Sequence, residues 1–111
     1  MKNSVSLKEN RRFRFLYHKG TSHANDWLVL YLKETQKPQN RLGLTVSKKV
    51  GNAVTRNHIR RLLRENYRLR EGAIKIGYDL VFVARSRAAK ADFHVLGQAM
   101  EQLLNRAELL Q

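Results

Sequence analysis

Residues 50–70 read Val50-Gly-Asn-Ala-Val-Thr-Arg-Asn-His-Ile-Arg-Arg-Leu-Leu-Arg-Glu-Asn-Tyr-Arg-Leu-Arg70. Apolar residues recur here at intervals of three and four, which predicts an amphipathic helix entered through a turn at Gly51. At about 100° per residue these side chains share one face, which we expect to pack on a sheet. The expected inner face comprises Ile59, Leu62, Leu63, Asn66 and Leu69.

The opposite face of this helix carries a row of arginines. Those spaced four residues apart lie above one another along the helix. Each such like-charged pair costs a few tenths of a kcal/mol, so a merely solvated face would be more stable with mixed charges. A planar guanidinium matches phosphate oxygens, and we therefore predict that this face binds a nucleic-acid backbone. The residues predicted to do so are Lys48, Lys49, Arg56, Asn57, Arg60, Arg61, Arg64 and Arg68.

The net charge is concentrated in two segments of the chain. The 111 residues carry a formal charge of +13, from 22 Lys and Arg against 9 Asp and Glu. Residues 48–70 hold eight basic residues and one acidic residue, and residues 1–24 hold six and one, whereas residues 71–111 are neutral. Self-repulsion on this scale disfavours a compact state. We therefore expect a polyanionic partner.

A second helix is expected near the N-terminus. Ser6 and Glu9 have the spacing of a capping box, which predicts that the helix starts there, and Gly20 is its expected end. Phe13, Leu16 and Tyr17 fall within one arc of this helix. Three arginines are expected to point elsewhere, namely Arg11, Arg12 and Arg14.

The remaining patterns indicate a sheet and a third helix. Segments 27–33 and 42–47 are rich in β-forming residues and predict a hairpin with a loop that contains the only proline. A strongly apolar strand is expected over 78–85 and a short strand over 21–24. Asp92 is the expected N-cap of a helix over 92–105.

The composition excludes several function classes. The chain is long enough for one domain only, spanning residues 1–111. It has no cysteine, no histidines at metal-ligand spacing, no paired carboxylates and no phosphate-binding or nucleophile motif, so we expect no bond chemistry by the protein itself. The longest apolar run has six residues and the first nine residues resemble no signal peptide, which predicts a soluble cytoplasmic protein without membrane contact.

The run from Ser47 to Glu65 resembles the signature of the bacterial ribonuclease P protein component, whose core reads approximately GxAxxRNxxKRxxRE. The stretches SLKENRRF from Ser6, GTS from Gly20 and LGLTVSKK from Leu42 also match in order and spacing, so the resemblance covers nearly the whole chain. Two positions depart from the family pattern. His58 stands where the family usually has the second arginine of an RNR triplet, and Arg60 replaces the commoner lysine.

The resemblance implies an α+β fold, a single-domain α/β sandwich of order αβββαβα with a mixed sheet of about four strands. It also implies a left-handed crossover through the arginine helix, against the general rule. The family's protein binds a large catalytic RNA and grips the 5′ leader of precursor tRNA beside its N-terminal helix. By resemblance, Phe13, Tyr17 and Tyr31 line that cleft. The RNA performs the hydrolysis with Mg²⁺; we expect no cofactor bound tightly by the protein, and a monomer as the free protein.

Elementary chemistry supports this division of labour, but it leaves alternatives open. Arginines on a rigid helix suit the phosphates of folded RNA, whereas aromatic rings suit the bases of a single strand. Plain core packing is the competing interpretation for Phe13 and, less strongly, for the two tyrosines. A ribosomal-type RNA-binding protein without a processing role is the alternative function. A basic membrane-surface protein is disfavoured, because the apolar face of the arginine helix is needed to cover the sheet.

Overall fold

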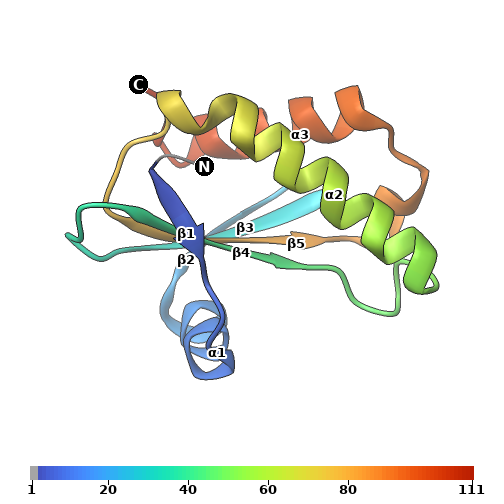
Figure 1. Ribbon diagram of the computed structural model, residues 1–111, viewed down its shortest axis with the longest axis horizontal. Helices are drawn as coiled ribbons and strands as arrows, with labels where there is room; N and C mark the ends of the chain where they lie inside the picture. The colour runs from blue at the N-terminus through green and yellow to red at the C-terminus, as the bar shows by residue number, and fades with distance from the viewer. Residues whose placement is uncertain (1–2) are drawn as a thin grey trace.

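A mixed sheet of five strands lies between two helical layers, with α2 and α3 above it and α1 below it in Figure 1. The computed structural model describes residues 3–111. The strands are β1 (Ser4–Ser6), β2 (Thr21–Ala24), β3 (Leu28–Glu34), β4 (Asn40–Thr45) and β5 (Tyr78–Ala84). The helices are α1 (Asn10–Lys19), α2 (Ala53–Arg70) and α3 (Phe93–Arg106), with short 3-10 turns η1 (Glu71–Ala73) and η2 (Ser86–Lys90).

The sheet confirms the α+β class but corrects two details of the prediction. It has five strands rather than about four, because the polar segment Ser4–Ser6 forms β1 beside β4. The predicted hairpin is wrong, since β3 and β4 do not pair with each other. β5 lies between them, antiparallel to β3 and parallel to β4. β5 is the most apolar strand, and the central position buries both of its faces.

The connection from β4 to β5 is the expected left-handed crossover. In Figure 1, β4 runs from left to right, α2 returns above the sheet, and β5 runs from left to right behind β4. The chain therefore turns anticlockwise as it recedes from the viewer. This hand places α2 across the sheet above β4, and so places the arginine row beside the edge of that strand.

The N-terminal helix begins later than its sequence predicts. Ser6 belongs to β1, and α1 starts at Asn10 with no side-chain hydrogen bond from Glu9 in the N-cap position. The capping box is absent because Ser6 is engaged in the sheet. The expected end at Gly20 is confirmed, where the N–H donates to the carbonyl of Leu16 at 2.9 Å.

The arginine helix α2 is capped by Asn52, whose side chain accepts a hydrogen bond from the Thr55 N–H. Its inner face is rotated from the predicted one. Leu69 is 58% exposed, whereas Tyr67 is fully buried and its hydroxyl lies 2.7 Å from Ser4 Oγ. The cause is β1, which extends the sheet under the C-terminal half of α2 and gives Tyr67 a polar partner. Helix α3 follows its prediction, with Asp92 accepting from the Val95 N–H.

Candidate nucleic-acid interface

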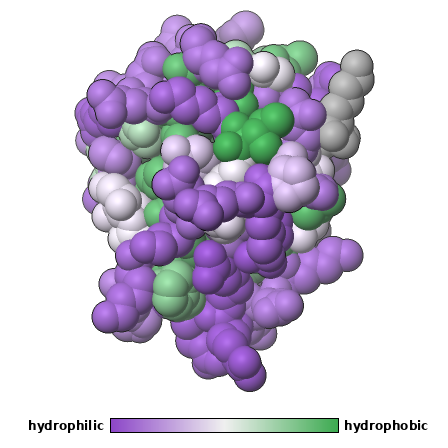
Figure 2. Space-filling view, turned by 90° about the vertical axis from the view of Figure 1, so that its left-hand side faces the viewer, coloured by the Kyte–Doolittle hydropathy of each residue, from purple (hydrophilic) through white to green (hydrophobic). Residues whose placement is uncertain are grey.

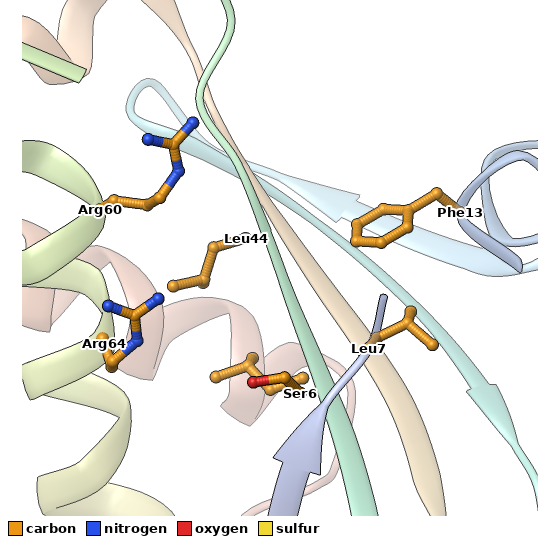
Figure 3. A pocket seen from close by; sticks show the side chains of 7 residues that line it. Ser6, Leu7, Phe13, Leu44, Arg60 and Arg64 are labelled. Carbon is orange, nitrogen blue, oxygen red and sulfur yellow. The ribbon is translucent and has the colours of Figure 1, made fainter. Parts of the chain in front are cut away.

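A groove follows the edge of β4 between α1 and α2 (Figure 3). It forms because β1 ends at Ser6, which leaves the rest of β4 without a neighbouring strand on that side. Two adjoining cavities make up the groove, one of about 170 Å³ and one of about 480 Å³. Phe13, Leu44 and Arg60 line both. The smaller cavity also reaches Ser6, Leu7, Leu42 and Arg64, and the larger one reaches Asn10, Arg14, Tyr17, Thr45 and Val46.

The two sides of the groove differ in chemistry. Figure 3 shows Arg60 and Arg64 extending from α2 toward β4, with Phe13 on the opposite side and Leu44 between them. Arg14 adds a third cation from α1, although the sequence placed it away from the aromatic face. None of the described residues that line the groove is acidic. The groove therefore presents an aromatic ring and three guanidinium groups to whatever enters it.

The three predicted aromatic residues do lie together. The ring centroids of Phe13 and Tyr17 are 6.4 Å apart, and those of Tyr17 and Tyr31 are 4.9 Å apart in an edge-on arrangement. Phe13 and Tyr17 line the groove, whereas Tyr31 packs in the small apolar cluster under α1. The Tyr17 hydroxyl lies 2.9 Å from Thr45 Oγ1. Phe13 is partly buried and Tyr17 is exposed, so both rings keep surface available for stacking.

Gly43 allows the Phe13 ring to lie directly against β4. A Cβ atom built on Gly43 would come within 2.6 Å of the ring atom Cζ of Phe13, a separation that real contacts do not allow. A side chain at this position would therefore require the Phe13 ring to shift from its place against the strand. Sequence reasoning did not single out this glycine, because only the fold brings α1 onto β4.

The side chains predicted to bind RNA divide into those that have a hydrogen-bond or ion-pair partner and those that have none. Arg56 donates to the Gly51 carbonyl, Arg60 donates to the Asn57 side chain, and Arg68 pairs with Glu65. The hydrogen bond from Arg68 lowers the pKa of the exposed Glu65 carboxyl. Within residues 3–111, four of the predicted side chains make no hydrogen bond or ion pair. These are Lys48, Lys49, Arg61 and Arg64, all exposed.

A buried ion cluster holds α1 against the sheet. The Asp79 side chain on β5 is 1% exposed and accepts from Arg12 Nε at 2.6 Å and from Arg41 Nε and Nη2 at 2.7 Å each. Burial alone would raise the pKa of the Asp79 carboxyl. The hydrogen bonds from Arg41 and Arg12, together with their charges, outweigh burial and hold that pKa below its ordinary value. The cluster fixes the helix that carries Phe13 and Tyr17.

This cluster was not predicted from the sequence, although one signal was present. Asp79 stands within an otherwise apolar strand, and a lone carboxylate there requires a cationic partner. The identity of that partner is not readable from spacing, since Arg12 and Arg41 lie 67 and 38 residues away. Arg12 was expected merely to point away from the aromatic face.

The end of the molecule where α2 finishes has a largely hydrophilic surface (Figure 2). Figure 2 looks at the end of the molecule where α2 finishes, and it shows apolar side chains only in separate small patches. In the described part of the chain, no group of three or more histidine and acidic side chains is arranged to hold a metal ion. No helix within residues 3–111 has the length and hydropathy needed to cross a bilayer.

Comparison with known proteins places these features in a family. The model of the family described as Ribonuclease P matches residues 1–108. The chain belongs to this family. A ribonuclease P protein component from Alkaliphilus metalliredigens is 41% identical over 110 residues, covering 99% of each chain. One from Thermoanaerobacter sp. strain X514 is 43% identical, covering 95% of this chain and 90% of the relative.

Solved structures of the family share the fold. A Staphylococcus aureus RNase P protein mutant, described as having defective mRNA degradation activity, superposes with a TM-score of 0.88 at 34% identity. It covers 96% of this chain, which in turn covers 90% of it. The RNase P protein from Thermotoga maritima has a TM-score of 0.83 at 30% identity, with coverage of 91% and 96%. The chain is therefore similar to ribonuclease P protein components in both sequence and fold.

Proposed function

We propose that this protein is the non-catalytic subunit of a ribonuclease P in which it binds both the catalytic RNA and the 5′ leader of precursor tRNA. The RNA carries out the Mg²⁺-dependent hydrolysis that removes the leader. The observation that supports this proposal best is the groove itself, where Phe13 and Tyr17 face Arg60 and Arg64 across an open strand edge. A single RNA strand offers the matching pair of surfaces, base faces and phosphates.

The catalytic RNA is assigned to the outer face of α2. Arg61 is exposed and unpaired in the described structure, and Lys48 and Lys49 extend this cationic surface beyond the N-terminus of the helix. Folded RNA presents phosphates and 2′-hydroxyls rather than base edges, because its major groove is deep and narrow. Unpaired guanidinium groups on a rigid helix suit those phosphates. We expect the free protein to be a monomer that works in the cytoplasm.

The experiment that tests the proposal is reconstitution. Purified protein alone should leave precursor tRNA uncut, and addition of the cognate RNA should give leader removal at low Mg²⁺ concentration, where the RNA alone is inactive. Cleavage by the protein alone would contradict the proposal. Recovery of ribosomal RNA, rather than ribonuclease P RNA, on the protein isolated from cells would instead support a ribosomal-type RNA-binding protein.

The leader assignment has its own test. Tyr17→Ala should weaken binding of precursor tRNA to the assembled enzyme more than binding of mature tRNA, because only the precursor carries a leader. Loss of one stacking surface corresponds to about 1–3 kcal/mol, or roughly 5- to 150-fold in affinity. Phe15→Ala is the matched control, because Phe15 is an exposed aromatic residue on the same helix but does not line the groove. Equal losses for precursor and mature tRNA would argue against a leader groove.

A further inference from the structure

The edge of β4 inside the groove carries peptide groups that the sheet does not use. β1 pairs with β4 over three residue pairs only, from Ser4–Asn40 to Ser6–Leu42. The Asn40 N–H donates to the Asn3 carbonyl at 2.9 Å, and the Leu42 carbonyl accepts from the Leu7 N–H at 2.8 Å. In a β-ladder every second residue turns both of its peptide groups toward the same neighbouring strand. Leu44 is therefore the next residue that faces this open edge.

The chain that could pair with Leu44 turns away. After Leu7 it leaves the edge and enters α1 at Asn10. On the other side of Leu44, the Val46 carbonyl already accepts a hydrogen bond from Arg60 Nη2 at 3.5 Å. Within residues 3–111, the Leu44 N–H and carbonyl have no hydrogen-bond partner on this edge. One donor and one acceptor thus stand side by side between two occupied positions.

These two groups lie within the groove. Leu44 lines both cavities, with Phe13 on the α1 side and Arg60 on the α2 side (Figure 3). A base that enters the groove therefore meets both the Phe13 ring, on which it can stack, and the open strand edge at Leu44. The phosphates that flank such a ring would lie within reach of Arg60 and Arg64.

We propose that the Leu44 N–H and carbonyl hydrogen-bond the Watson–Crick edge of one leader base that stacks on Phe13. This inference rests on the proposed function, which places the leader in the groove. Each RNA base has a donor and an acceptor adjacent on that edge: N6–H and N1 in adenine, N4–H and N3 in cytosine, N1–H and O6 in guanine, N3–H and O4 in uracil. A peptide donor and acceptor can therefore pair with any of them. The contact adds affinity with little preference for one base.

A peptide strand is the other ligand that suits an open strand edge. The lining of the groove favours RNA instead, because Arg14, Arg60 and Arg64 surround the edge and no described lining residue is acidic. An aromatic ring beside the edge adds a stacking surface that a peptide strand does not need. The formal charge of +13 points the same way.

The first test replaces leader bases one position at a time in precursor tRNA bound to the assembled enzyme. At one position, a difluorotoluene nucleoside, which stacks but hydrogen-bonds poorly, should weaken binding about tenfold, the effect of one to two net hydrogen bonds. Exchange among the four natural bases there should change affinity less than about threefold. A scan in which the isostere is tolerated at every leader position would overturn the inference. So would a preference of tenfold or more for one base at the sensitive position.

The second test measures hydrogen exchange at single amides in the assembled enzyme, quenched and then read on the dissociated protein. The Leu44 amide should exchange fast without precursor and at least tenfold more slowly with it. With a precursor that carries the isostere at the sensitive position, the Leu44 amide should still exchange fast. This result would show that protection comes from a hydrogen bond and not from exclusion of solvent. The Gly43 amide, which the alternation turns toward β5, is the control that is protected throughout.

The outcomes separate this inference from the proposed function. Leader-dependent binding with an unchanged Leu44 amide would overturn the inference alone. Absence of any leader-dependent binding would overturn the proposed function. Protection of Leu44 by an acidic strand-forming peptide, with none from precursor tRNA, would assign the edge to a protein ligand and also overturn the inference.

Discussion

The two faces of the sheet are built differently. On the α2 and α3 face, a continuous apolar core runs from the leucines of β3 through Leu80 and Phe82 of β5 to the inner sides of both helices. On the α1 face, the buried apolar residues within the described range 3–111 are Leu7, Leu16 and Val81, and the buried carboxylate Asp79 lies on the same face. Neighbouring residues of β5 supply both faces, because successive side chains of a strand point to opposite sides.

The difference shows how one small domain combines a stable core with a cationic and aromatic groove at its surface. Burial of apolar area on the upper face stabilises the fold, and it leaves the outer side of α2 free for arginines. The lower face holds α1 with few apolar contacts and keeps Phe13 and Tyr17 half-exposed at the groove. Because little apolar area is buried on the α1 face, the ion pairs at Asp79 help to hold α1 against the sheet. Aromatic surface is thereby available to a ligand.

The largest test of this contrast compares two fully buried leucines. Leu63→Ala on α2 should lower the free energy of unfolding by about 3–5 kcal/mol, because the surrounding core is large and collapses little around a cavity. Leu16→Ala on α1 should cost about 2–3 kcal/mol, since its small cluster can relax. Urea unfolding measures both values. Equal costs, or a larger one at Leu16, would remove the distinction between the two faces.

The ion cluster predicts a specific pH dependence. The folded-state pKa of Asp79 lies below its ordinary value, so its contribution to stability is present above about pH 4 and disappears as the pH falls through the folded value. Asp79→Asn should cost about 1–3 kcal/mol at pH 7, a range reduced because Arg12 and Arg41 are each about a quarter exposed. Unfolding of wild type and variant from pH 7 to 2 checks both points.

The variant and the wild type should approach the same stability in acid, where the Asp79 carboxyl is protonated. Asp26→Asn is the matched control, because Asp26 is highly exposed in its ion pair with Arg87. We expect no measurable change for that variant. A difference between Asp79→Asn and wild type that persists unchanged at low pH would show that the cluster acts through packing rather than charge.

The arginines of α2 should affect binding far more than stability. Arg60→Ala and Arg64→Ala together should reduce the slope of log K against log salt for the catalytic RNA or precursor tRNA by one to two units, as expected for lost phosphate contacts. The free energy of unfolding should change by no more than about 1 kcal/mol. Neither side chain forms an ion pair within residues 3–111, and Arg60 donates only an exposed hydrogen bond to Asn57 and a long one to the Val46 carbonyl. Arg106→Ala, on α3, is the control. An unchanged slope would show that neither arginine contacts phosphates of the RNA.

The smallest effect is expected from a hydroxyl group. Tyr17→Phe removes the hydrogen bond to Thr45 but keeps the ring, so the free energy of unfolding should fall by about 0.5 kcal/mol or less at this exposed site. Leader-dependent affinity should remain within about twofold, measured by competition between precursor and mature tRNA. A loss as large as that of Tyr17→Ala would mean that the hydroxyl, rather than the ring face, makes the contact.

Local patterns were enough to predict most elements of the fold. The spacing of apolar residues located α2 and α3, Asp92 was confirmed as an N-cap, and Gly20 as the end of α1. These features depend on interactions within a few residues, which a sequence records directly. The RNA-binding roles of the arginine row and the aromatic residues stay predictions, although the structure does bring Phe13, Tyr17 and Tyr31 together.

Most of the errors share one cause, which is β1. Three residues of mostly polar sequence carry no strand signal, yet their pairing with β4 removes the capping box at Ser6 and buries Tyr67. The same pairing ends after Leu42, and this ending opens the groove. The false hairpin is the one error that β1 does not explain: proximity in sequence favoured pairing of β3 with β4, whereas β5 inserts between them.

Residue type and short-range spacing were enough to establish the resemblance to the family, the segregation of charge and the two faces of the arginine helix. Three features emerged only in the folded molecule: Arg60 and Arg64 share a groove with Phe13, Asp79 joins Arg12 to Arg41, and the Leu44 peptide groups face the open edge of β4. Each of these contacts joins segments distant in the chain. Their geometry depends on strand order and crossover hand, which burial of the whole core selects.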